Sequence, residues 1–193
     1  MNYCRELPEG YSEIFTVNLQ KDRKMALKLN VAALIVAVIM AVPMHFYIPF
    51  GSLFDFSQGF GMYCLRFGVL IAGYFAYIVL HELTHGVTMK IFGCDKVKYG
   101  FTGLYAFAGC DGYFGKKSYI AVALSPVVVW GIVLAVINVF VPESWFWVVY
   151  FIQIGNISGA AGDFYVTCKF SRMPKDILVK DIGVGMTVYS AQN

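Results

Sequence analysis

Long apolar runs alternate with short polar connections along this chain. Four runs reach the roughly 20 residues that a membrane-spanning helix requires, and they cover residues 25–50, 65–92, 118–141 and 145–168. Only residues 142–144 separate the third run from the fourth, which predicts a tight hairpin of helices. Pro126 lies inside the third run, where a neighbouring helix can satisfy the carbonyl that a proline leaves free. The pattern predicts an all-α polytopic membrane protein with four transmembrane helices.

The connection between the second and third runs differs from the others, because it is rich in glycine and aromatic residues. Within residues 93–117, the apolar Val97, Tyr99 and Phe101 alternate with polar or small residues. A period of two is typical of a β-strand, and a similar alternation covers residues 14–19. We expect a small β-like cytoplasmic insert between helices 2 and 3, and a further strand near the N-terminus.

The basic residues indicate which side of the membrane each connection occupies. All 15 Lys and Arg residues except Arg66, which leaves 14, precede or open the first run, surround the second connection or follow the fourth run. Cytoplasmic segments carry an excess of Lys and Arg. The distribution predicts a multi-pass protein of the cell membrane, with cytoplasmic N- and C-termini and a cytoplasmic tail at residues 169–193.

The composition agrees with a membrane protein. Hydrophobic residues make up 59% of the chain and charged residues 14%, whereas about a quarter of a soluble domain is charged. The length of 193 residues suggests one membrane-embedded domain covering residues 1–193. The net charge of +3 does not indicate nucleic-acid binding, because the basic residues flank apolar runs and form no single patch. The expected surrounding is the lipid bilayer, and the oligomeric state stays open.

The five cysteines carry no recognisable pattern. They are scattered, and no Cys-x-x-Cys occurs. An odd, unpatterned set argues against a disulfide framework. Cys94 and Cys110 are possible metal ligands, but no histidine or second cysteine pair accompanies them.

The strongest chemical signal is the segment His81-Glu82-Leu83-Thr84-His85 near the end of the second run. On a helix, this spacing places two imidazoles on one face, where they can share a zinc ion, and leaves Glu82 as the general base for a bound water. A pair of satisfied structural histidines is the weaker alternative. Gly86, directly after the pair, is expected to permit close helix packing.

Asp163 is the candidate for the third zinc ligand. It and Glu82 are the two acidic residues within the four apolar cores, and an ionisable side chain at membrane depth indicates a functional site. His81 precedes Lys90 by nine residues and Asp163 precedes Lys169 by six, which places both roughly 9–14 Å from the cytoplasmic ends of their helices. A catalytic zinc site needs three protein ligands and one open position. His81, His85 and Asp163 supply the three ligands.

Asn156 is a candidate catalytic residue on the same predicted helix as Asp163. It lies two turns before Asp163, within a run of small residues that lets membrane helices approach closely. Its amide could stabilise the oxyanion of a tetrahedral intermediate. A hydrogen bond between helices is an equally open interpretation.

These features resemble those of site-2-type intramembrane metalloproteases, in which a later helix carries an aspartate ligand. The chain more closely resembles the small bacterial membrane proteins grouped as the putative zincin peptidase family. The segments that carry this likeness are His81 to Gly86, Ala123-Leu124-Ser125-Pro126, Asn156 to Tyr165, and the tail from Val179 to Tyr189. The resemblance implies a membrane fold with a zinc site.

The sequence departs from the site-2 pattern around the third ligand. The usual Leu-Asp-Gly is Gly162-Asp163-Phe164 here, and Ile157-Ser158-Gly159 stands where a proline-containing turn is usual. These departures leave open where the helix breaks near Asp163 and what Asn156 does.

The function that the sequence predicts is a zinc-dependent peptidase, a metallopeptidase that acts in or near the membrane through water activated by zinc and Glu82. Its substrate would be a membrane protein or peptide of unspecified identity. Two alternatives stay open. A divalent-cation transporter would use the same ligands as a transit site, and an inactive membrane scaffold would keep the zinc for stability.

Overall fold

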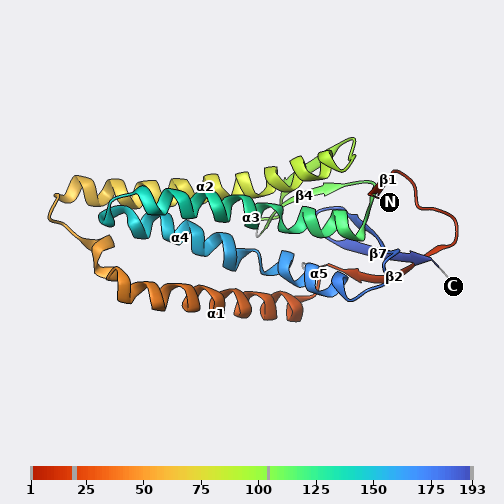
Figure 1. Cartoon of the computed structure of the whole chain (residues 1–193), viewed down its shortest axis with the longest axis horizontal. Helices are drawn as coiled ribbons and strands as arrows, with labels where there is room; N and C mark the ends of the chain where they lie inside the picture. Colours follow the sequence, from red (N-terminus) through yellow and green to blue (C-terminus); the bar gives the residue numbers. More distant parts are fainter. Residues whose placement is uncertain (1, 19–20, 104, 192–193) are drawn as a thin grey trace. The chain divides into compact units, whose positions relative to one another are not determined.

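The structure, a computed structural model, describes residues 2–18, 21–103 and 105–191. Within these residues the helices are α1 (Arg23–Tyr47), η1 (Phe50–Phe54, a 3₁₀ helix), α2 (Phe60–Ile91), α3 (Lys116–Phe140), α4 (Glu143–Gly159) and α5 (Ala161–Ser171) (Figure 1). The strands are β1 (Tyr3–Cys4), β2 (Tyr11–Val17), β3 (Val97–Phe101), β4 (Ala106–Cys110), β5 (Tyr113–Gly115), β6 (Leu178–Asp181) and β7 (Met186–Ala191).

The chain forms two compact units, and the long helices α1, α2 and α3 contribute residues to both. Unit 1 contains Met1–Leu29, His81–Ser125 and Gly162–Asn193. Unit 2 contains Asn30–Leu80 and Pro126–Ala161. The predicted site residues therefore divide between the units: the histidine pair, Glu82 and Asp163 belong to unit 1, and Asn156 belongs to unit 2.

Unit 1 is built on an antiparallel sheet whose strands come from three distant parts of the chain. The strand order is β1-β5-β6-β7-β2. Phe114 pairs with Val179, and Val179 with Val188, and all three side chains are fully buried. Met89 of α2 and Phe170 of α5 complete this core. Strands from both ends of the chain therefore share one sheet with β5, which follows the β3–β4 hairpin.

The remaining strands form a hairpin. β3 pairs with β4 in a separate two-stranded sheet, with Val97 opposite Cys110 and Phe101 opposite Ala106. The alternation of apolar residues at 97–101 thus coincides with β3. The alternation at residues 14–19 coincides with β2 up to Val17, and residue 19 lies outside the described residues.

The prediction of an all-α protein with four transmembrane helices is wrong. The five-stranded sheet makes the protein a mixed α and β structure. Among the described residues, three helices, α1, α2 and α3, are long and apolar enough to cross a membrane. The fourth apolar run is divided, because α4 ends at Gly159 and α5 starts at Ala161. Between them, Ala160 leaves helical geometry with φ −80° and ψ 19°. Glycine is a poor helix former, so Gly159 favours a break at this point.

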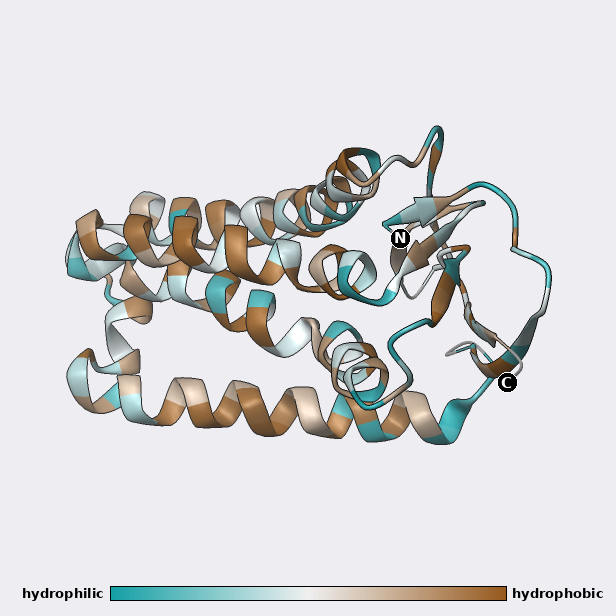
Figure 2. Ribbon diagram, turned by 45° about the vertical axis from the view of Figure 1, so that its right-hand side comes forward, coloured by the Kyte–Doolittle hydropathy of each residue, from teal (hydrophilic) through white to brown (hydrophobic). Residues whose placement is uncertain are grey.

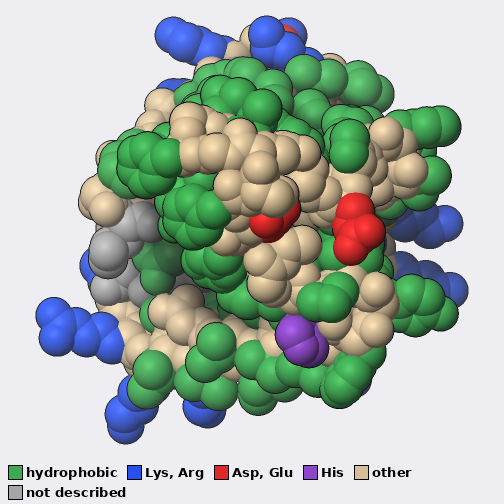
Figure 3. Space-filling model, turned by 90° about the vertical axis from the view of Figure 1, so that its left-hand side faces the viewer, with side chains coloured by type: hydrophobic (Ala, Val, Ile, Leu, Met, Phe, Trp, Pro, Cys, Tyr) green, Lys and Arg blue, Asp and Glu red, His purple; other side chains and the backbone are tan. Residues whose placement is uncertain are grey.

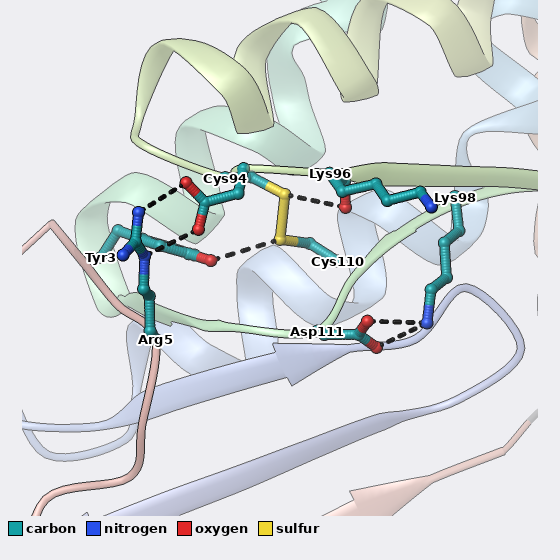
Figure 4. Close-up of a disulfide and its surroundings, with 8 residues drawn as sticks. Tyr3, Arg5, Cys94, Lys96, Lys98, Cys110 and Asp111 are labelled. Atoms are coloured by element: carbon teal, nitrogen blue, oxygen red, sulfur yellow. Dashed lines mark hydrogen bonds and ion pairs between the residues drawn. A yellow bond between two sulfur atoms is a disulfide. The ribbon is translucent and has the colours of Figure 1, made fainter.

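Cys94 and Cys110 form a disulfide at the base of the β3–β4 hairpin (Figure 4). Cys94 follows α2 and Cys110 ends β4, and the pairing of Val97 with Cys110 brings the two close, with 6.4 Å between the Cα atoms. The argument against a disulfide framework therefore missed this one bridge. The disulfide could not be predicted from the sequence because strand pairing, and not a local motif, brings the two sulfur atoms together.

The N-terminal segment packs against this disulfide. The Tyr3 hydroxyl lies 3.7 Å from Cys110 Sγ, and Arg5 forms an ion pair with Asp95 at 2.7 Å (Figure 4). A Cβ on Gly112 would overlap the Tyr3 ring. Glycine at position 112 therefore lets β1 close over the base of the hairpin.

Aromatic side chains fill one end of unit 2. Trp147 of α4 is 2% exposed, donates from its indole N–H to the Ile48 carbonyl at 3.1 Å, and meets the Phe50 ring of η1 edge-on. Arg66 is fully buried and donates to the Ser52 carbonyl at 3.2 Å. In Figure 3, which looks onto this end, hydrophobic side chains (green) and the backbone and other side chains (tan) cover most of the face, with acidic side chains (red) and histidine (purple) among them.

Helix α1 has no buried residue. Its apolar side chains are open to the surroundings, with Leu34 65% and Ile39 63% exposed. Figure 2 shows hydrophobic residues along most of the helix and hydrophilic residues at its start. A continuous exposed apolar surface marks a contact with a membrane or another protein.

Candidate metal centre

Helix α2 places the two histidines of the motif side by side. His81 and His85 lie one turn apart, so their side chains project from the same face. Their Nε2 atoms are 3.1 Å apart. Both side chains are largely buried, at 13% and 11% exposed.

Asp163 completes a group of three donors. It lies in the first turn of α5, directly after the break at Ala160. One carboxylate oxygen lies 3.5 Å from His81 Nε2, and the other lies 3.5 Å from His85 Nε2. The structure therefore brings together the three residues that the sequence singled out as ligands. Their role as ligands stays a prediction.

The spacing of these donors fits a zinc ion. Two ligands that bind tetrahedral zinc at 2.0–2.2 Å lie roughly 3.3–3.6 Å apart. The two Nε2 atoms are 3.1 Å apart, slightly closer than this range, and each lies 3.5 Å from a different oxygen of the Asp163 carboxylate. With one donor atom from each residue, the three atoms lie within 4.8 Å of one another. Three protein donors leave one tetrahedral position for water or substrate, as in catalytic zinc sites.

A backbone carbonyl fixes the orientation of His85. Nδ1 of His85 lies 2.9 Å from the Val122 carbonyl oxygen of α3. A carbonyl only accepts hydrogen bonds, so Nδ1 carries a proton, which leaves Nε2 as the ring atom that can present a lone pair. This lone pair faces His81 and the Asp163 carboxylate. Such an electron-rich group is suited to a cation, and the same outer hydrogen bond accompanies most metal-binding histidines.

Pro126 explains why the Val122 carbonyl is available. In a helix, that carbonyl would accept from the N–H of the residue four positions later, and Pro126 has no N–H. Ser125 Oγ donates to the same carbonyl at 2.8 Å. The expectation that a neighbouring helix satisfies the carbonyl freed by Pro126 is confirmed, and the neighbouring group is His85.

Replacing Pro126 by alanine should weaken zinc binding. The new N–H would compete with His85 Nδ1 for the Val122 carbonyl, and loss of such an outer partner typically costs about 10–100-fold in metal affinity. Competition with a zinc chelator measures the change. Pro43→Ala, in α1, is the matched control and should leave the zinc affinity unchanged. Equal affinity in the Pro126→Ala and unchanged proteins would contradict this role of the proline.

A second buried carboxylate borders the donor group, and sequence reasoning did not single it out. Asp181 of β6 accepts from the Tyr119 hydroxyl at 2.6 Å and from the Gly183 N–H at 2.8 Å. Burial raises the pKa of Asp181, and these two hydrogen bonds oppose the rise; the charges of His85 and Asp163 also act on it. The only signal in the sequence was its place within the tail segment 179–189.

Asn156 is fully buried in unit 2, and both ends of its amide are bonded. Tyr77 Oη donates to its Oδ1 at 3.0 Å, and its Nδ2 donates to the Val127 carbonyl at 3.2 Å. These bonds join α2, α3 and α4. They match the alternative of a hydrogen bond between helices, and the oxyanion role of Asn156 stays a prediction.

A helix bearing His-Glu-x-x-His, joined by a carboxylate from a later helix, has the donor set of a zinc peptidase. The model of the family described as "Putative zincin peptidase" matches residues 74–178, which is more than half of the chain. The chain belongs to this family. No curated protein and no solved structure gives a significant match.

Proposed function

We propose that this protein is a zinc-dependent peptidase that hydrolyses peptide bonds within or close to the membrane, as one membrane-embedded domain of the site-2 type. The observation that carries the proposal is the cluster of His81, His85 and Asp163 beside Glu82. The two Nε2 atoms lie 3.1 Å apart, and each lies 3.5 Å from a different oxygen of the Asp163 carboxylate. Membership of the zincin peptidase family supports the class of enzyme. Membrane proteins or peptides are the proposed substrates.

His81, His85 and Asp163 would hold the zinc ion. When bound, zinc would make water a nucleophile near neutral pH and polarise the substrate carbonyl. Glu82 follows a ligand directly in the sequence and forms no ion pair with a described basic residue. It takes a proton from the attacking water and returns it to the leaving nitrogen. The Val122 carbonyl keeps the His85 ring oriented throughout.

Peptide hydrolysis by the purified protein tests this function. Glu82→Gln is the decisive variant, since it removes the base and keeps the proposed ligands. Loss of turnover with zinc retained supports the peptidase. A transporter or a scaffold would keep its biological activity in that variant.

We further propose a multi-pass protein of the cell membrane with cytoplasmic termini. The length and apolar composition of α1, α2 and α3 support insertion. The sheet shared by strands from both ends of the chain supports termini on one side, so the segment after α3 would return the chain to the side on which it started. The 14 basic residues on that side favour the cytoplasm. The Cys94–Cys110 disulfide favours the opposite orientation, since disulfides persist in oxidising compartments. We propose the cytoplasmic orientation because 14 basic residues support it, whereas a single disulfide opposes it.

The free cysteines offer a test of orientation. Cys64, near the start of α2, and Cys168, in α5, are both exposed and unpaired. In single-cysteine variants of intact cells, a membrane-impermeant maleimide should label Cys64 and should reach Cys168 only after permeabilisation. Labelling of Cys168 from outside, with Cys64 protected, would reverse the proposed orientation.

A further inference from the structure

Tyr99 of β3 places its hydroxyl on the helix that carries the histidine pair. The contact is at Gly86, the residue after His85. A Cβ at position 86 would overlap the Tyr99 hydroxyl and lie 2.6 Å from Cζ of the ring. Glycine is therefore needed for this approach. The neighbour expected at Gly86 was another helix, whereas its closest neighbour is a strand side chain.

The hydroxyl lies on the Glu82 side of the histidine pair. Glu82 and Gly86 are four residues apart, so they form a row on α2 next to the row of His81 and His85. Burial raises the pKa of Tyr99, and the negative charge of Glu82 raises it further. The phenol is thus protonated near neutral pH and able to donate a hydrogen bond.

The phenol is held in position, and its hydroxyl remains available to a substrate. The ring is 48% exposed, and among the described residues its hydroxyl forms no hydrogen bond. The hairpin that carries it is tied to the end of α2 by the Cys94–Cys110 disulfide, and Cys110 pairs with Val97, two residues before Tyr99. A positioned donor beside a general base is what stabilisation of a developing oxyanion requires.

We propose that Tyr99 is a further catalytic residue, whose phenol donates a hydrogen bond to the carbonyl oxygen of the scissile peptide as negative charge develops there. This inference rests on the proposed peptidase function. The water oxygen bonds to the carbonyl carbon, and the π electron pair moves onto the carbonyl oxygen, while Glu82 holds the water proton. Collapse of the intermediate breaks the C–N bond, and Glu82 passes the proton to the leaving nitrogen. Tyr99 keeps its own proton throughout.

Tyr99→Phe is the first test. The ring still packs on Gly86, so zinc content and fold should not change, but kcat should fall roughly 10²–10³-fold, as for other oxyanion donors, with KM nearly constant. A phosphinic peptide, a tetrahedral anion, should bind at least about tenfold more weakly, because a transition-state analogue reports this interaction. Tyr105→Phe removes a hydroxyl from the loop of the same hairpin and should behave like the unchanged protein.

Gly86→Ala is the second test. The new Cβ displaces the hydroxyl, and the half-exposed ring has room to move, so turnover should fall with zinc retained. The Gly86→Ala, Tyr99→Phe double variant should be no slower than the slower single variant, since both changes remove one interaction. Fully additive losses would overturn the inference.

These outcomes separate the two proposals. If the unchanged protein cleaves peptides, Glu82→Gln does not, and Tyr99→Phe cleaves them and binds the phosphinic peptide normally, then only the role of Tyr99 fails. If the unchanged protein cleaves no peptide or Glu82→Gln is fully active, the peptidase function itself fails.

Discussion

Glu82→Gln should lower peptide hydrolysis by roughly 10²–10⁴-fold, the usual cost of losing a positioned acid–base group. Glutamine has nearly the same shape as glutamate, so α2 and the three donors should stay in place. The amide cannot accept the proton of the attacking water. Turnover of a peptide substrate by zinc-loaded protein in detergent measures the effect, with zinc content determined on the same sample.

Glu143→Gln is the matched control for this variant. Glu143 opens α4 and belongs to unit 2, so the same chemical change there should leave turnover unaltered. If Glu82→Gln instead restores full function to cells that lack the protein, zinc would serve transport or stability, and the peptidase assignment would be lost.

Asp163→Ala should remove most of the bound zinc. The Asp163 carboxylate reaches both histidines, with 3.5 Å to each Nε2 atom, and it supplies the negative charge of the donor group. Two histidines alone give fewer than the three protein ligands of a catalytic zinc site. Metal analysis of the purified variant should show a loss as large as that in His85→Ala.

Asp111→Ala is the control for the loss of an aspartate. Asp111 is exposed and pairs with Lys98 on the hairpin, so its removal should leave the zinc content unchanged. Full zinc occupancy in Asp163→Ala would show that the third ligand lies elsewhere, and Asp181, a buried carboxylate of unit 1, would be examined next.

The donor group could be predicted from the sequence because its chemistry is local or limited by depth. The spacing of His81 and His85 fixes their common face on any helix. Asp163 is a predictable ligand because a carboxylate in an apolar run requires a partner. Its position six residues before Lys169 places it at nearly the same membrane depth as the histidines. Both arguments need only helix geometry, and the structure brings the three residues together.

The sheet could not be predicted in the same way. Its strands join segments as distant as Tyr3 with Phe114 and Tyr11 with Ala191, and no periodicity within one segment specifies a distant partner. β6 has only four residues and β1 only two, too few for a clear period. The alternation at residues 14–19 indicates β2, but β1 and β6 carry no such signal, so the long helical runs dominate the all-α prediction.

The contacts that orient the site could be predicted only in part from the sequence. Pro126 indicated a free carbonyl in α3, but which side chain would use it depends on the packing of α3 against α2. Gly86 indicated a close approach, and the structure supplies Tyr99 as its neighbour. The division of the fourth run at Ala160, which places Asp163 at the start of a helix, depended on a weak glycine signal.

We expect His81, His85 and Asp163 to hold one zinc ion. Zinc-edge X-ray absorption of the purified, zinc-loaded protein tests this expectation most directly. We predict only nitrogen and oxygen ligands at about 2.0–2.2 Å, with weaker imidazole scattering from any zinc that His85→Ala retains. A sulfur shell at about 2.3 Å, or an unchanged spectrum in His85→Ala, would contradict the account.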